Sequence, residues 1–362
     1  MSEEENTSNP DRTVLVLGAG FTRAFLPKAP LLIDHYDVDP LLQKFAAFPN
    51  AHGILEQEIV NDDDGPILNI ERLMTRLQGR MPYDSEQRVG PELDLLLSEI
   101  KAIFLARVKS AKQGQFHEKE MLALARYCVE HSISCITFNY DDVFDQKLHE
   151  VNPVINAGEK STYWHPDGGY GFFCRPSLMC IEDLDLLKDT TAMNLLKLHG
   201  SINWRPIRGS LTPVGFADVF HHETWLDPHP DQSGWSETDR NAVEDHLEPD
   251  PFLVPPVLTK SAIVEEPLLR LIWSLAYKEL RSADEVVFVG YSFPPTDMAA
   301  RFLFREALAD LETARIKVVN YDRGVAANDD LRRQYGDVFQ TIDDEQFDLD
   351  GAVEWSRTFC AK

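Results

Sequence analysis

The stretch that most constrains the fold lies near the N-terminus. Residues 14–23 read VLVLGAGFTR, an aliphatic run followed at once by a Gly-Ala-Gly turn. A short apolar run that ends in glycines predicts a buried strand, and the residues after the turn can open a helix. Strand, glycine turn and helix together form the first half of a dinucleotide-binding fingerprint. Arg23 occupies the place of the third glycine in G-x-G-x-x-G, so the fingerprint is incomplete.

Further strands and helices alternate along the second half of the chain. Short β-branched runs predict strands, and apolar residues at three- and four-residue steps predict helices. The predicted strands span 132–138, 195–200, 285–290 and 315–320, and the predicted helices span 142–149, 263–283 and 296–311. Strand, helix and strand at this spacing form βαβ units. The sequence therefore predicts an α/β protein with a parallel, doubly wound sheet.

The segment after the glycine turn departs from that alternation. Prolines at positions 27, 30 and 40 break regular structure, and helical periodicity dominates from about 40 to 131. We therefore predict a main domain of residues 10–30 and 132–345, interrupted by a helical insertion of residues 31–131. Residues 205–260 are rich in Pro, Asp, His and Trp with little periodicity, which predicts an irregular excursion or small lobe of the main domain.

Composition narrows the class of protein. The net charge of −25 argues against direct binding to nucleic acid or anionic lipid, which needs clustered Lys and Arg. No apolar run approaches the length of a membrane span, and the acidic N-terminus is unlike a signal peptide, so we expect a cytoplasmic protein. Five scattered cysteines without a C-x-x-C pair predict reduced thiols and no metal site.

Polar or glycine residues follow every predicted strand. In order along the chain these are Gly18–Arg23, Asn139–Asp142, His199–Ser201, Gly290–Asp297 and Asn320–Asp322. Parallel sheets bind ligands at the carboxyl ends of their strands. Each group taken singly also fits a structural role: the glycines a tight turn, Asn139 or Asp141 a helix cap, and Thr296 another cap. Five such groups at one edge of one sheet predict a ligand site.

The residue types at this edge indicate a chemistry. His199 can exchange a proton near neutral pH, while Asn139 and Asp141 can orient hydroxyl groups or water. The chain has no Walker lysine and no G-x-S-x-G elbow, which disfavours nucleoside triphosphate hydrolysis and esterase chemistry. The histidines at 221, 222, 229 and 246 match no usual ligand spacing, so no metal is predicted.

Five blocks in this order, VLGAGFTRAF, ITFNYDD, LLKLHGSINW, VVFVGYSFPPTD and KVVNYD, resemble the sirtuin superfamily, and specifically its divergent bacterial members associated with antiphage defence. The resemblance implies a Rossmann-like sheet with an inserted helical module. It also implies that NAD⁺ is a substrate that loses nicotinamide and is not a hydride carrier.

The resemblance also assigns roles to residues of the five blocks. It implies a phosphate-binding turn, a nicotinamide-ribose pocket with a catalytic base, and a pair of turns that hold the adenosine half. These roles fall in that order on Gly18, Ala19, Gly20, Phe21 and Thr22; on Asn139, Asp141 and His199; and on Gly290, Ser292 and Asn320.

Two departures from the protein-deacylating sirtuins shift the predicted reaction. The turn runs into AFLPKAPLLID where those enzymes carry a GIPDFR-type segment, and the two pairs of zinc-binding cysteines are missing. The prediction is therefore an NAD⁺ glycohydrolase that depletes NAD in defence, without a metal. A sirtuin-type deacylase or mono-ADP-ribosyl transferase, and a non-enzymatic subunit that senses NAD or ADP-ribose, stay open as alternatives. The resemblance further implies a homo-oligomer or a separate ATPase or nuclease partner.

Overall fold

The computed structural model describes most of both predicted domains. The described residues are 12–63, 65–78, 91–114, 116–151, 164, 166–172, 193–206, 219–221, 251–254, 266–294, 297–340 and 342–361. Most of the predicted excursion at 205–260 lies outside these ranges. Its described parts include the short antiparallel pair β7 (Trp204–Pro206) and β8 (Val219–His221).

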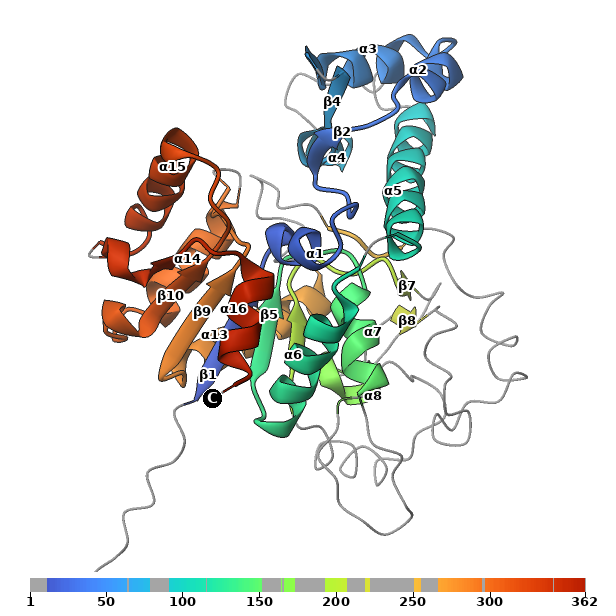
Figure 1. Ribbon diagram of the computed structural model, residues 1–362. Helices are drawn as coiled ribbons and strands as arrows, with labels where there is room; N and C mark the ends of the chain where they lie inside the picture. Colours follow the sequence, from blue (N-terminus) through green and yellow to red (C-terminus); the bar gives the residue numbers. More distant parts are fainter. Residues whose placement is uncertain are drawn as a thin grey trace, which may run out of the picture.

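A six-stranded sheet with every neighbouring pair parallel forms the centre of the molecule (Figure 1). In spatial order its strands are β11 (Phe347–Asp348), β10 (Ile316–Val319), β9 (Glu285–Val289), β1 (Thr13–Leu17), β5 (Ser134–Thr137) and β6 (Leu195–Lys197). The chain starts at β1, adds β5 and β6 on one side, then crosses to β9 and adds β10 and β11 on the other. This is the Rossmann strand order, and the order reverses between β1 and β9. The predicted fold class is confirmed.

Helices cover both faces of the sheet. On one face α6 packs against α7 and α16, and α1 packs against α16. On the other face α13 packs against α14 and β6, and the rings of Phe304 in α14 and Tyr335 in α15 both contact Phe288 of β9. The helices are α1 (Ala19–Phe25), α6 (Glu118–Glu130), α7 (Val143–Glu150), α8 (Pro166–Gly169), α13 (Pro267–Arg281), α14 (Met298–Ala307), α15 (Val325–Gly336) and α16 (Ala352–Phe359).

The inserted segment leaves the sheet domain after α1 and stands beyond it in Figure 1. It holds the predicted helices as far as α5, whereas α6, also within the range 31–131, packs with α7 and α16 of the main domain. It also holds an antiparallel sheet of order β2-β4-β3, which the sequence pattern did not predict. Its elements are β2 (Ile33–His35), α2 (Asp39–Phe45), α3 (Pro49–Gln57), β3 (Ile59–Asp62), β4 (Gly65–Asn69), α4 (Ile70–Gln78) and α5 (Pro91–Lys112). The two ends of the segment meet where the N–H of His117 donates to the carbonyl of Phe25 at 2.9 Å.

The chain continues the main sheet past residue 345, the end of the predicted domain. Short 3-10 turns precede β10 (Thr313–Arg315) and β11 (Asp344–Gln346). β11 then pairs with β10, and α16 packs on the helical layer. Among the residues that the structure describes, no helix is both long and apolar enough to span a bilayer.

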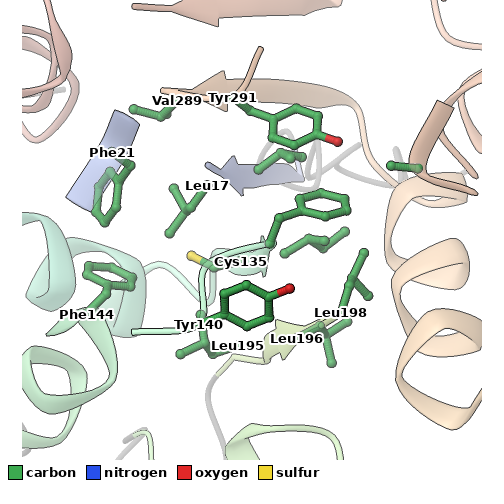
Figure 2. Packing of buried hydrophobic residues seen from close by; sticks show 14 of the residues in the cluster. Leu17, Phe21, Cys135, Tyr140, Phe144, Leu195, Leu196, Leu198, Val289 and Tyr291 are labelled. Atoms are coloured by element: carbon green, nitrogen blue, oxygen red, sulfur yellow. The ribbon is translucent and has the colours of Figure 1, made fainter. Parts of the chain in front are cut away.

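The strand ends lie in register. Leu17 pairs with both Thr137 and Val289, Thr137 pairs with Lys197, and Val289 pairs with Val319. The residues that follow these five therefore begin one continuous edge, as the sequence predicts. Beneath the edge the strands are mostly apolar and buried, and Figure 2 shows this packing around Leu17, Cys135, Leu196 and Val289. This core fixes the positions of the polar residues at the edge.

Candidate functional site

Three glycines interlock at the reversal point of the sheet. The N–H of Gly18 donates to the carbonyl of Val289 at 3.0 Å, and the N–H of Gly20 donates to the carbonyl of Gly290 at 2.9 Å. A Cβ on Gly18 would lie 2.5 Å from the Gly290 oxygen, and one on Gly290 would lie 2.1 Å from the nitrogen of Phe21. Gly290 also has a φ of +64°, which favours glycine. The glycines are thus required for the close approach of two strand ends.

The same contacts limit which N–H groups of the turn can receive a phosphate. The N–H groups of Gly18 and Gly20 already donate to the carbonyls of β9 and Gly290, and the N–H of Phe21 donates to the carbonyl of Gly18 at 2.9 Å. The Phe21 ring is buried against Phe144, with 5.3 Å between ring centroids. Ala19 is exposed at the first position of α1, where an N–H has no acceptor within the helix. The part of the predicted turn that is open to an anion is therefore the start of α1 at Ala19.

Asn139 is held with its carbonyl oxygen free. Its side-chain nitrogen donates to the carbonyl of Gly18 at 2.8 Å and to the hydroxyl of Thr22 at 3.1 Å. Because a backbone carbonyl can only accept, the atom that faces Gly18 must be the nitrogen, which fixes the orientation of the amide. The oxygen Oδ1 of Asn139 is buried and has no hydrogen-bond partner among the described residues. This oxygen can accept a hydrogen bond from a hydroxyl group or a water.

Asp141 connects the same segment to α1 and α7. Its carboxylate accepts from the Thr22 hydroxyl at 2.9 Å and from the N–H of Val143, the first residue of α7, at 3.1 Å. The N-cap of α7 is Asp142, so the structural alternative of Asn139 or Asp141 as the cap is wrong. Asp141 instead accepts from the first N–H of the helix and orients Thr22. Burial raises the pKa of the Asp141 carboxyl, and the charge of Lys197 only partly opposes this.

His199 is buried in an aromatic surrounding just past β6. Its ring lies 5.3 Å from the ring of Phe138, 6.1 Å from that of Tyr140 and 6.3 Å from that of Trp273, measured between centroids. Its Nε2 has no hydrogen-bond partner among the described residues. Burial lowers the pKa of His199 from 6.5 to about 3. The imidazole is therefore neutral at physiological pH and can accept a proton.

The ends of β9 and β10 border a cavity of about 220 Å³. Its walls include Ser292, Tyr321, Arg323 and Asn328. Asn320 lies beside it, with its Oδ1 accepting from the N–H of Tyr321 at 3.0 Å and its buried Nδ2 without a partner in the described part of the chain. Two of the predicted adenosine-binding residues thus carry polar groups that a nucleoside can use.

The structure brings the predicted residues together in two groups. Hydrogen bonds join Gly18, Thr22, Asn139 and Asp141, and the ring of Phe138 bridges to His199 and, at 4.5 Å, to Tyr291 of the β9 end. Ser292, which lines the cavity, and the buried Asn320, which directly precedes the lining residue Tyr321, form the second group. No hydrogen bond between described residues links Asn320 to Asn139 or His199. Gly290 connects the two groups through Gly20.

Several residues of the site escape sequence reasoning. The N-cap of α14 is Asp297, whose carboxylate accepts from the N–H of Ala300 at 3.2 Å and from the Tyr291 hydroxyl at 3.0 Å; Thr296 lies outside the described residues. Burial raises the pKa of Asp297 to about 6. The buried cation Lys197 contacts Asp141 and Asp145. Its charge within the apolar run LLKLHG is the one sequence signal that pointed to it.

In the described ranges no three His, Cys, Asp or Glu side chains gather as a metal site would require. Cys128, Cys135 and Cys360 are free thiols. The predicted absence of a metal stays a prediction.

Among solved structures, several of Sir2 homologues are similar to this chain. No protein-family model and no curated protein matches the chain. A Sir2 homologue mutant in complex with ADP-ribose is 13% identical over 97% of this chain and 90% of its own, with a TM-score of 0.37. A Sir2 homologue in complex with NAD is 14% identical over 96% and 90%, with a TM-score of 0.34. A Sir2 homologue mutant in complex with 2′-O-acetyl ADP-ribose is 13% identical over 97% and 92%, with a TM-score of 0.41. The likeness is distant, and the fold assignment rests on strand order and register.

Proposed function

We propose that this protein is an NAD⁺ glycohydrolase, which cleaves the bond between nicotinamide and ribose to give nicotinamide and ADP-ribose. The observation that carries the proposal is a pair of buried atoms at neighbouring strand ends, Oδ1 of Asn139 and Nε2 of His199, which have no hydrogen-bond partner in the described part of the chain. Unpartnered buried polar atoms are costly, and such atoms are common where a ligand completes the hydrogen bonds. The motif blocks of the sequence support NAD⁺ as that ligand.

The reaction needs little from the protein beyond position and a proton acceptor. As the C–N bond breaks, nicotinamide leaves with the bonding electrons and the ribose acquires oxocarbenium character. In this proposal Asn139 accepts a hydrogen bond from the attacking water and directs its oxygen to C1′. The water proton then passes to His199, and the products are nicotinamide, ADP-ribose and one proton. Holding the reactants in this geometry supplies much of the rate acceleration.

The low pKa of His199 is compatible with this role. Water that has attacked an oxocarbenium carbon is an oxonium, which is far more acidic than an ordinary water. A neutral imidazole with a pKa near 3 is therefore a sufficient acceptor, and at pH 7 it is present entirely in the accepting form. Thr22 and Asp141 act as positioning residues, since their hydrogen bonds fix Asn139.

The second part of the proposal concerns the rest of the substrate. The diphosphate is received at the start of α1, where Ala19 is exposed at the positive end of the helix dipole. Ser292, Asn320 and the adjoining cavity receive the adenosine half. Cytoplasmic NAD depletion in antiphage defence, by a homo-oligomer or with an ATPase or nuclease partner, is the biological role that the motif blocks support.

The test is mass analysis of the products from NAD⁺, with and without an acyl-lysine peptide. We expect the parent to form nicotinamide and ADP-ribose without peptide, and His199→Ala and Asn139→Ala to lose this activity. His131→Ala is a matched control, because this exposed histidine lies at the opposite edge of the sheet. Peptide-dependent release of nicotinamide would instead indicate a deacylase or transferase. If the parent consumes no more NAD⁺ than His199→Ala in either reaction, the enzyme proposal is wrong, and binding of ADP-ribose without turnover would favour a sensing subunit.

A further inference from the structure

Lys197 is a fully buried cation at the end of β6. Its exposed fraction is 0%, and the flanking Leu196 and Leu198 are buried as well. Placing an ammonium group in an apolar core costs several kcal/mol unless it is paired and hydrogen-bonded. The pairing partner is Asp145 of α7, whose two carboxylate oxygens lie 3.1 and 3.2 Å from the nitrogen Nζ of Lys197.

The carboxylate of Asp145 is fixed from a second side. The hydroxyl of Tyr170 donates to its Oδ1, and the side-chain nitrogen of Asn203 donates to that hydroxyl at 3.2 Å. All four of these side chains, Lys197 included, are buried. Asp145 is thus a rigid support on which the Lys197 ammonium is held.

The remaining contact of Lys197 reaches the candidate site. Its Nζ donates to the main-chain carbonyl of Asp141. Residue 141 lies between β5 and α7, outside any strand or helix, so neither kind of regular structure supplies a donor to that carbonyl. A hydrogen bond from a cation is about twice as strong as a neutral one. Lys197 therefore holds the backbone of the segment whose side chains bind Gly18 and Thr22.

We propose that Lys197 is a positioning residue for the hydrolase site. Its ammonium ties the backbone of Asp141 to the fixed carboxylate of Asp145, and so holds the side chains of Asn139 and Asp141 in the geometry that the reaction uses. This inference rests on the proposed NAD⁺ hydrolysis for its catalytic consequence. The anchoring itself can be measured without any turnover.

The test compares two double variants of the full chain that differ in one hydrogen-bond donor. Lys197→Gln with Asp145→Asn keeps an amide that can donate to the Asp141 carbonyl. Lys197→Met with Asp145→Asn has the same net charge and a side chain of similar size, but no donor. Neither leaves an unpaired buried charge where the ion pair was. Lys317→Met with Glu285→Gln is the control, because it removes an ion pair between two other strands of the sheet, near the edge opposite their carboxyl ends.

We expect the Met variant to lose at least about tenfold in kcat with KM changed by less than about threefold, as for an interaction that matters mainly in the transition state. Peptides that cover residues 139–143 should exchange their amide hydrogens about tenfold faster or more. The Gln variant and the control should stay within about threefold of the parent in both measurements. A general loss of stability of the Met variant would instead speed exchange throughout the sheet.

Two results overturn the proposal. One is a folded Met variant with parental kcat and parental exchange at 139–143. The other is a folded Gln variant whose kcat falls by more than about tenfold. If the Met variant does not fold, this second result decides the question. If the parent does not hydrolyse NAD⁺, the proposed function fails. The exchange at 139–143 then decides alone: faster exchange in the Met variant supports the anchoring role, and unchanged exchange excludes it.

Discussion

At the ends of β5 and β6 the polar side chains of Asn139 and His199 are buried, whereas Ser292, Tyr321 and Arg323, which follow β9 and β10, border an open cavity. Asn139 and His199 are 8% and 2% exposed, and hydrogen bonds fix the segment around Asn139. Across the sheet, Tyr321 is 52% exposed, and Arg323 stacks on its ring at the cavity mouth. A rigid, desolvated group suits bond breaking, and an open polar cavity suits recognition. The comparison predicts that changes in the first region lower kcat and changes in the second raise KM.

The largest effect is expected for His199→Ala. Removing a proton acceptor lowers kcat by about 10²–10⁴-fold with little change in KM. Steady-state hydrolysis of NAD⁺ measures both constants, and His131→Ala should behave as the parent. A rise in KM with unchanged kcat would place His199 in substrate recognition and contradict the comparison.

The next effect tests the glycine contact that joins the two regions. In Gly18→Ala the new Cβ would meet the backbone of Gly290 and Tyr291 at 2.5 Å, and backbone atoms cannot rotate away. We expect the free energy of unfolding to fall by about 3 kcal/mol or more. Denaturant unfolding measures this. Gly53→Ala is the control, because nothing lies within 4 Å of the added Cβ and alanine favours helix α3 by about 0.5–1 kcal/mol. Equal stability of the two variants would mean that the strand ends do not touch.

A pH effect follows from the burial of His199. Its pKa is about 3 when folded and 6.5 when exposed, so between these values the unfolded chain binds more protons and stability falls as the pH is lowered. Relative to His199→Gln, the parent should lose about 2 kcal/mol between neutral pH and pH 5.

The comparison with the variant is needed because Asp297 acts in the opposite direction. Its pKa is raised from 3.8 to about 6, so the folded state holds the proton more tightly and stability rises as the pH is lowered toward 3.8. This contribution is common to parent and variant and cancels in the difference. His131→Gln should retain the pH dependence of the parent. A difference between parent and His199→Gln that does not change with pH would show that His199 is solvated.

The smallest effect is expected at Asn320, which follows β10 and directly precedes the cavity residue Tyr321. Asn320→Asp keeps the oxygen that accepts from Tyr321 but replaces the unpartnered donor Nδ2 with an acceptor. We expect KM for NAD⁺ to rise about tenfold, or about 1.4 kcal/mol, with kcat nearly unchanged. Asn61→Asp, at an exposed position of the inserted sheet, should leave both constants unchanged. A loss of kcat alone in Asn320→Asp would assign both strand-end regions to the chemistry.

The sequence predicts those features that depend on neighbouring residues and on the parallel sheet. The apolar runs before Gly18, Asn139 and His199 locate three strands, and the alignment of parallel strand ends brings their polar followers to one edge. The strands of the insertion are harder to predict, because β2 has only three residues and too few positions to show an alternation.

Long-range partners could not be predicted either. Nothing local to Gly20 indicates that its N–H binds Gly290, and nothing in LLKLHG identifies Asp145 as the partner of Lys197. Such pairs are selected by the packing of distant segments. The buried charge of Lys197 signals that a partner exists, but only the fold supplies its identity.

The hydrogen bond from His117 to Phe25 has a consequence for the length of the inserted segment. It brings the two ends of the inserted segment together, so that the chain leaves and rejoins the sheet domain at neighbouring points. Lys112 and Phe104 of α5 add contacts with Asp142 and Tyr140. The entropy of closing a loop grows only slowly with its length. A change in the length of the segment alone therefore costs the sheet domain little.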